Sequence, residues 1–268
     1  MNVASALLDL LALPGVEQAA TDARADLDAL LWNRQLLKVA EPVGVEVSAR
    51  SVRASAALDG ADVSLASIRS GAAFDGSPMG RVVAAASAMR AELPALTAVQ
   101  RTAPMQAWAR LAALAGAGFV ADAGLGRPRA DDHVEDPLHL GPVPPAAMVT
   151  ARLEQLARIA IESTAPAVVV SAVVHGELLA LRPFSYGNGL VARAAARLVL
   201  AARGVDKDFL SVPEAGVLSA GRPIYVSCAR EFASGTSEGV ARWIVFWCAA
   251  LHEGALETGA IAAEIDAD

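Results

Sequence analysis

The chain has 268 residues, enough for one large domain or for a domain with a smaller extension. Apolar residues make up 54% of it and aromatic residues only 4%, so the core must be built mainly from Ala, Val and Leu, which suit close helix packing. The formal net charge of −7 argues against nucleic acid or an anionic membrane as the main partner.

Cysteine use and hydropathy indicate a cytoplasmic protein. The two cysteines, Cys228 and Cys248, lie in apolar, helical-looking segments, which favours buried free thiols over a disulfide. The apolar run from Ala4 to Leu13 has no basic region before it and is interrupted by Asp9, so it is not expected to be a secretory signal. The most hydrophobic windows are too short or too polar to span a bilayer, so we expect no membrane association.

The N-terminal quarter is predicted to be helical. A short helix over Ala4–Leu13 precedes an amphipathic helix from Val16 to Leu37, in which Ala and Leu recur at three-to-four spacing. Residues 41–44, with Pro and Gly, are predicted to break the pattern. A further helix is predicted from Val45 to Leu58, ending at Asp59-Gly60 with a glycine stop.

Residues 64–115 continue as helices punctuated by proline. Ser77 is a plausible N-cap because proline follows it at the first helical position. Pro94 is predicted to interrupt the helix that starts there. The helices predicted in this part are Ser64–Arg69, Ser77–Leu93, Ala95–Arg101 and Met105–Ala115.

Residues 116–145 are predicted to form a long structured loop, because ten of these thirty residues are Gly or Pro. Long loops in compact domains are usually functional. His133 and His139 lie among acidic residues in it, which raises the possibility of a metal site. Neither histidine has helical ligand spacing and no cysteine is nearby, so a solvated loop is the favoured interpretation and we expect no metal.

The next stretch combines a helix end, a glycine turn and a helix start. An apolar helix over residues 166–181 breaks at Arg182-Pro183-Phe184, turns through Gly187-Asn188-Gly189, and restarts from Leu190 to about Arg203. The free N–H groups and positive dipole of a helix start can bind a phosphate, and Arg193 one turn on could reach it. The alternative is an inter-helix turn with a glycine cap.

The remaining helices are predicted over Glu214–Ala220, Ile224–Phe232 and Ser237–His252. The tail to Asp268 is acidic and low in hydrophobic bulk, so we expect it to be frayed or loosely packed. His175, two turns before Arg182, is interpreted as a core histidine or one that supports a neighbouring site residue.

Residues 182–193 resemble the signature of the Fic (Fido) family, His-Pro-Phe-x-Asp/Glu-Gly-Asn-Gly-Arg-x-x-Arg. The best-known members of this family transfer AMP from ATP to protein hydroxyls. The resemblance implies an all-α fold with a small β-hairpin flap and an N-terminal helical extension. It suggests an N-terminal helical segment over residues 1–75, a Fic-like core over 76–253 and a tail over 254–268. The matching residues are Pro183, Phe184, Gly187, Asn188, Gly189 and Arg193.

Three positions depart from that signature. Arg182 stands at the family's histidine base, and a guanidinium has no usable lone pair to accept a proton. Tyr186 replaces the acid that binds Mg²⁺, and a protonated phenol is a poor ligand for that ion. Leu190 replaces a phosphate-binding arginine, while Arg182 adds a cation nearby, so the phosphate site could have moved rather than vanished.

A second resemblance concerns regulation. Ser55, Asp59 and Gly60 are similar to the inhibitory helix of many Fic proteins, Ser/Thr-x-x-x-Glu-Gly/Asn, whose glutamate pairs with the last arginine of the signature. We therefore expect Asp59 to contact Arg193, its shorter side chain leaving room for a water. The alternative is a solvated acid at a helix end.

The resemblance also implies ligand and partner contacts. The long loop would act as the flap that guides a partner protein, with Arg127 and Arg129 as its basic residues. The spacing of Arg222 and Tyr225 resembles the family's Arg-x-x-Tyr stretch beside the nucleotide base. The expected nucleotide-binding residues are Arg182, Phe184, Ser185, Gly187, Asn188, Gly189, Arg193 and Tyr225.

Three functions remain open from the sequence. The first is a degenerate Fic protein that binds ATP or another phosphorylated ligand with little need for Mg²⁺, and binds a protein partner at the flap. The second is a transferase with altered chemistry. The third is a structural interaction domain that binds no nucleotide. An exposed Ala/Leu face on the N-terminal helices also makes a homodimer plausible.

Overall fold

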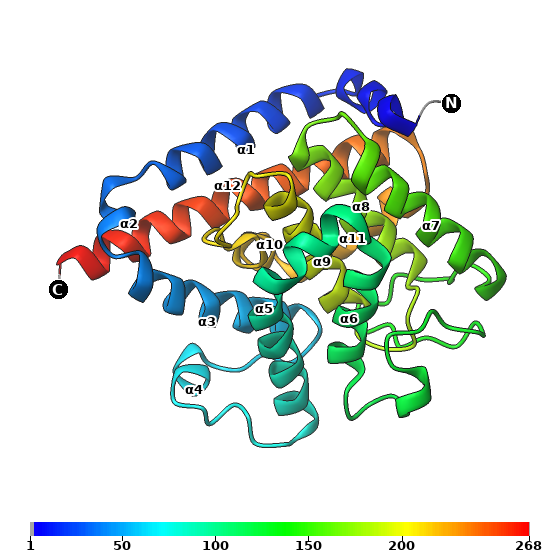
Figure 1. Cartoon of the computed structure of the whole chain (residues 1–268), viewed down its shortest axis with the longest axis horizontal. Coiled ribbons are helices and arrows are strands. Elements are labelled where there is room, and N and C mark those ends of the chain that lie inside the picture. Colours follow the sequence, from blue (N-terminus) through cyan, green and yellow to red (C-terminus); the bar gives the residue numbers. More distant parts are fainter. Residues whose placement is uncertain (1–2, 268) are drawn as a thin grey trace.

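The computed structural model describes residues 3–267, which form an all-helical fold with no strand in that range. Figure 1 shows its layout, with α1 and α12 running above α3, α2 and α4 beside α3, and α5, α6, α7 and α11 around α8 and α9. The helices are α1 (Val16–Leu31), α2 (Arg34–Lys38), α3 (Ala40–Leu58), α4 (Leu65–Arg69), α5 (Pro78–Thr102), α6 (Pro104–Gly116), α7 (Ala146–Glu162), α8 (Ala167–Leu181), α9 (Asn188–Ala202), α10 (Pro213–Ala220), α11 (Arg222–Ala233) and α12 (Ser237–Ala267).

The centre of the molecule is the pair α8 and α9, which pack against each other more extensively than any other two helices in residues 3–267. α8 is apolar except for a few positions such as Glu177, and α9 is buried along nearly its whole length, as expected of helices enclosed by others. Gly176 lets α11 and α12 approach α8 closely, because a Cβ there would lie 2.7–2.8 Å from Trp243 and Phe232. This central pair presents residues 182–190 at one end.

The C-terminal segment is a continuous helix, so the expectation of a frayed tail is wrong. α12 runs to Ala267, beside α1 (Figure 1). Small and apolar residues continue on its inner face, with Ala255, Ile261 and Ala262 buried. Thr258 adds a hydrogen bond of 2.7 Å to the Leu210 carbonyl. Low hydrophobic bulk did not prevent packing, because small side chains allow α1 to lie close.

The N-terminal helices differ in detail from the sequence prediction. The segment predicted as a helix over Ala4–Leu13 forms two 3-10 turns, Val3–Ser5 and Leu8–Ala12. The helix expected over Val16–Leu37 ends at Leu31, and α2 restarts because Asn33 caps its free N–H groups. α3 already begins at Ala40. Pro42 therefore lies in a first helical turn, where its missing N–H costs nothing.

α5 continues through Pro94, so the predicted break there is wrong. Leu93 and Leu96 are buried on both sides of the proline and hold the two halves against the core. By length and hydropathy α5 would suffice to cross a membrane, a test that core helices of many proteins also pass. In this fold it packs against α3, α6 and α9.

Residues 117–145 form the long loop, but the expected β-hairpin is absent from it. Only a short 3-10 turn, Asp122–Gly124, is regular. Prolines at 128, 137, 142, 144 and 145 lack the N–H donors that a strand ladder requires. The loop instead makes two backbone hydrogen bonds to the signature stretch, from Arg129 to Pro183 at 2.8 Å and from Glu135 to Ser185 at 3.1 Å.

Candidate functional site

The turn between α8 and α9 is built by its own residues. Gly187 has φ of 71° and precedes the first residue of α9, Asn188. The Asn188 side chain accepts a hydrogen bond from the Phe184 N–H at 2.9 Å and donates one to the Phe184 carbonyl at 2.6 Å. Asn188 and Phe184 are both buried, so they shape the turn. The free N–H groups of α9 point out of this turn.

A carboxylate from α3 occupies the start of α9. Asp59 follows the last residue of α3, and its Oδ2 accepts a hydrogen bond from the Leu190 N–H at 3.2 Å. A Cβ on Gly189 would lie 2.3 Å from Asp59 Oδ1, so only glycine permits this approach. Gly60, with φ of 95°, then turns the chain away. The anion position predicted at the helix start is filled by the protein's own anion.

Arg193 is the cation of this site. Its guanidinium is 1% exposed and donates to Asp59 Oδ1 from Nη2 at 2.9 Å, a direct contact rather than the water-mediated one expected. Ser55 accepts two further hydrogen bonds, at its hydroxyl (3.0 Å) and its carbonyl (2.8 Å). Burial alone would lower the pKa of Arg193, but Asp59 and Tyr225 hold it above its usual value. The expected Ser55–Asp59–Arg193 arrangement is therefore present. We call Asp59, Arg193 and the N-terminal turn of α9 the anion cradle.

Tyr225 and His175 support the cradle from behind. The Tyr225 hydroxyl lies 3.5 Å from Arg193 Nη1 and 2.8 Å from His175 Nε2. His175 is fully buried, which confirms the core interpretation, and burial together with Arg193 lowers its pKa well below the usual value. Burial raises the pKa of Tyr225 to about 12. Both groups are therefore neutral and orient Arg193 without competing for its charge.

Arg182 does not face the anion cradle. Its backbone is left-handed, with φ of 44°, and its buried side chain turns toward the long loop. It donates to Asp136 Oδ2 at 2.7 Å and to the carbonyls of Gly141 and Pro142 at 2.9 and 2.7 Å. The expectation that Arg182 supplies a relocated phosphate-binding cation is therefore wrong, because its hydrogen bonds are used to anchor the loop.

Tyr186 and Leu190 occupy apolar surroundings. Tyr186 stacks on Phe119 with 4.1 Å between ring centroids, and the Arg81 guanidinium lies 5.0 Å from the Phe119 centroid. Burial, with the negative charges of Glu135 and Asp59, raises the pKa of Tyr186 to about 12, so its phenol stays protonated. Leu190 is 2% exposed and belongs to the hydrophobic core. Neither side chain can take over the role of the residue it replaces in the signature.

The two arginines expected in the flap have different surroundings. Arg129 is buried and donates from Nε to the Arg182 carbonyl at 2.9 Å and from Nη1 to the Asp131 carbonyl at 2.7 Å. It is therefore a structural anchor, and the expectation that it is offered to a partner is wrong. Arg127 is exposed, as is Ser185 of the signature stretch.

Glu135 is a site residue that sequence reasoning missed. Its N–H bonds to Ser185, and its carboxylate is close enough to the Gly187 N–H to accept a hydrogen bond. Burial is the largest cause of a pKa raised to about 7, and the carboxylates of Asp59 and Asp136 add to it. The only signal in the sequence was the acidic run in the loop. Glu135 thus lies between two other carboxyl groups whose charges act on it, Asp59 of the cradle and Asp136 of the long loop.

This environment predicts that the protein loses stability as pH rises. Because the pKa of Glu135 is raised from 4.5 to about 7 on folding, the folded chain retains a proton that the unfolded chain loses in that interval. We expect the free energy of unfolding to fall by about 1–2 kcal/mol through this interval, after allowing for solvent screening. Urea denaturation between pH 4 and 8 measures it. The Glu135→Gln variant should lack this component, and parallel profiles for the two proteins would contradict the assignment.

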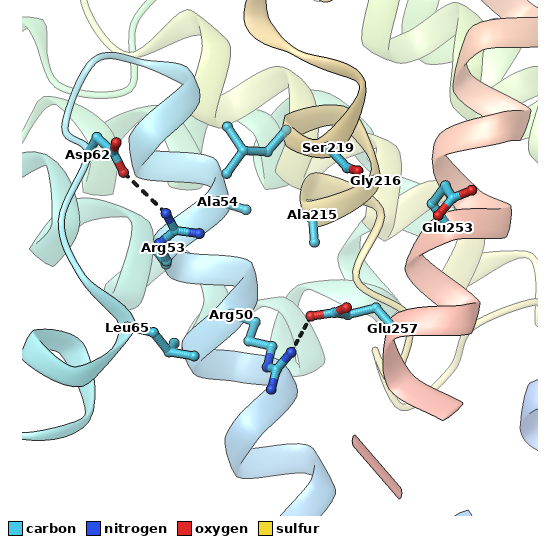
Figure 2. Close-up of a pocket in the computed structure, with 11 residues that line it drawn as sticks. Arg50, Arg53, Ala54, Asp62, Leu65, Ala215, Gly216, Ser219, Glu253 and Glu257 are labelled. Carbon is cyan, nitrogen blue, oxygen red and sulfur yellow. Dashed lines mark hydrogen bonds and ion pairs between the residues drawn. The ribbon is translucent and has the colours of Figure 1, made fainter. Parts of the chain in front are cut away.

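α3 is held in place near the cradle at two points. Near its C-terminal end, Arg222 donates to the Leu58 carbonyl at 3.1 Å. Near the middle of α3, Arg50 pairs with Glu257 of α12 (Figure 2). Arg50 also pairs with Glu46 of α3 itself, at 2.7 Å. A cavity of about 420 Å³ lies on this side, lined by α3, α10 and α12. It is distinct from the cradle, because Ser55 and Asp59 point to α9 instead.

The described part of the chain, residues 3–267, contains no group of three or more His, Cys, Asp or Glu side chains placed to hold a metal ion. The loop histidines His133 and His139 are both exposed. Glu135, Asp59 and Asp136 are near one another, but only as an acidic surrounding of the cradle.

The helical arrangement and the geometry of the turn together define a Fic fold, and comparison with solved structures agrees. A Fic family protein from Desulfovibrio desulfuricans G20 superposes with a TM-score of 0.70 at 18% identity, over 91% of this chain and 74% of that one. A fragment of Fic-1 from C. elegans superposes with a TM-score of 0.67 at 17% identity, over 92% and 73%. A variant of that fragment gives 0.66. No family model and no curated protein matches the sequence.

Proposed function

We propose that this Fic-fold protein binds ATP or another phosphorylated ligand at the anion cradle, and that Asp59 closes the cradle when the ligand is absent. The observation that carries the proposal is the position of the Asp59 carboxylate, on the Leu190 N–H and on Arg193. A helix N-terminus and a buried guanidinium together form an anion site. The carboxylate stands where a phosphate oxygen would bind.

A phosphorylated ligand can compete with Asp59 because it brings more charge. Asp59 offers one negative charge through a side chain at the end of α3. A triphosphate carries several and can engage Arg193 and the α9 N–H groups together. The closing contact therefore lowers the apparent affinity without removing the site. Mg²⁺ is not expected to matter greatly, since Tyr186 stays protonated where the signature has an acid.

AMP transfer by the family's mechanism is not expected of this protein. Arg182 stands at the base position and its guanidinium cannot accept a proton from an attacking hydroxyl. Its side chain also points away, toward Asp136. Loss of a positioned base typically costs on the order of a hundred- to ten-thousand-fold in rate.

A second candidate function is group transfer with altered chemistry, which one observation favours. Glu135 lies beside Gly187 with a pKa raised to about 7 by burial, and a carboxyl with such a pKa is suited to general base catalysis near neutral pH. Incubation of the Asp59→Ala variant with ATP labelled on the α-phosphate tests for transfer. Labelling that disappears on adding Glu135→Gln would support this function over simple binding.

Calorimetric titration with ATP, with and without Mg²⁺, tests binding. We expect weak binding by the wild-type protein and at least tenfold tighter binding by Asp59→Ala, because the competing carboxylate is gone. Adding Arg193→Ala to that variant should remove binding, whereas adding Arg24→Ala on the exposed face of α1 should not. An Asp59→Ala variant that folds but releases no heat at millimolar ATP would overturn the proposal and point to a purely structural interaction domain.

A further inference from the structure

The most exposed large apolar side chains lie together at one corner of the fold. Trp32, Leu37 and Val45 are 80%, 63% and 70% exposed, the highest values among the large hydrophobic residues between 3 and 267. They come from the junction of α1, α2 and α3, at the far end of the molecule from α7 (Figure 1). We call these three residues the Trp32 corner. Single exposed leucines are ordinary, but a cluster around a tryptophan indicates an interaction surface.

A groove adjoins the Trp32 corner. It has a volume of about 690 Å³, and its apolar lining includes Leu31, Leu36 and Leu210. Trp32 and Leu37 also line it, although both remain largely exposed. An indole buries about 150–250 Å² when it is enclosed, so a groove of this size and chemistry can accept one. A projecting indole and an apolar groove that can receive one therefore lie side by side on the same face.

We propose that the protein forms a two-fold symmetric homodimer in which Trp32 of each copy enters the groove of the other. A two-fold interface uses the same patch on both copies, so the patch must be complementary to itself. A knob beside its own matching groove meets that requirement. The inference does not depend on nucleotide binding, because this face is separate from the anion cradle.

The charges on this face favour a second copy as the partner. Its acidic residues are Asp28, Glu41 and Asp208, and its basic residues are Arg34, Lys38 and Lys207. The face is thus locally balanced, although the whole chain has a net charge of −7. Asp28 and Lys38 are paired within the chain, with Arg24 and Asp266, which leaves Glu41 and Asp208 as acids and Arg34 and Lys207 as bases with no ion pair in the described residues. Two copies that met through other surfaces would on average bring like charges together, whereas here these two acids and two bases can pair across the two-fold axis.

Sedimentation of the full chain over a range of micromolar to millimolar concentrations tests the dimer. We expect a monomer–dimer equilibrium for the wild-type protein and a dissociation constant at least about thirtyfold weaker for Trp32→Ser, since a central tryptophan is a typical hot spot. Ile224→Ser is the matched control, because Ile224 is 49% exposed on α11, away from this corner. A wild-type protein that stays monomeric, or a Trp32→Ser variant that dimerises as well, would overturn the proposal.

Tryptophan fluorescence gives an independent reading that needs no mutation. The other tryptophans, Trp108, Trp243 and Trp247, are at most 1% exposed, so a soluble quencher such as iodide should reach Trp32 almost alone. Quenching should decrease as protein concentration rises and Trp32 becomes enclosed. Quenching that is independent of concentration while a dimer forms would show that another surface is used, and would reject the Trp32 corner.

Discussion

The Asp59→Ala variant is expected to be less stable than the wild-type protein by about 3 kcal/mol in the absence of ligand. The substitution removes the Asp59 carboxylate and leaves Arg193 buried without a counter-ion. Breaking a buried ion pair in this way costs about 3–5 kcal/mol. The Ser55 hydroxyl and carbonyl still accept hydrogen bonds from the guanidinium, which places the expected loss at the lower end. Thermal or urea denaturation at neutral pH measures it.

The same variant should be stabilised more strongly than wild type by ATP. A ligand that binds only the folded state adds about 2.7 kcal/mol at a hundred times its dissociation constant, enough to offset most of the loss. The wild-type protein should gain less, because its own carboxylate competes for Arg193. Ser55→Ala serves as a control, since it removes one hydrogen bond from the charged guanidinium, worth about 1.5–3 kcal/mol, but leaves the ion pair in place and should not change the response to ATP. An Asp59→Ala variant as stable as wild type would contradict this account.

The largest loss of stability is expected for Arg197→Leu, by more than about 3–5 kcal/mol. Arg197 is 1% exposed and lies one turn beyond Arg193 on α9. Its guanidinium lies 3.5 Å from Asp206 and 3.3 Å from Glu214, both of which are buried. It also donates to the carbonyl of Ser211 at 2.6 Å. Leucine would leave two buried carboxylates without a cation in contact, since Arg90 acts on them only through its nearby charge. Urea denaturation would record the loss.

Arg203→Leu is the matched control for this prediction. Arg203 lies at the end of the same helix and donates to the carbonyls of Ala160 and Ser163, at 3.0 and 2.8 Å, with no acid among its hydrogen-bond partners in the described chain. Its loss should cost about 1–3 kcal/mol. Adding Glu214→Gln to Arg197→Leu should recover part of the stability, because one buried charge is removed. Equal costs for the two arginines would show that the buried carboxylates do not need Arg197.

The helices and the turn of the cradle could be predicted from the sequence, because local rules decide them. The apolar run of α8 and the serine–proline start of α5 follow from side-chain burial and capping. Gly187 is needed for a left-handed turn. The resemblance to a known signature added the pairing of Asp59 with Arg193, which no periodicity in either segment reveals.

The hydrogen-bond partners of the long side chains could not be predicted in this way. Arg182 and Arg129 each have several rotatable bonds, and the acceptors within their reach are loop carbonyls whose positions no local pattern specifies. The position of Glu135 beside the signature stretch could not be predicted either, because an irregular loop has no periodic pattern that indicates which residues its side chains contact. The expected β-hairpin is absent from the loop because its prolines lack the N–H donors that paired strands need.

The amino-acid sequence alone therefore determined that the chain is helical, where α8 ends and α9 starts, and that an anion position with a cation one turn away lies at that junction. Only the tertiary structure decided which groups fill that position. Asp59 lies at that position because α3 is held against α12 and α11. The Arg182 side chain lies elsewhere because it is hydrogen-bonded to Asp136 of the long loop. Backbone turns and burial periodicity depend on neighbours in the chain, whereas the partners of a charged side chain depend on segments that only folding brings together.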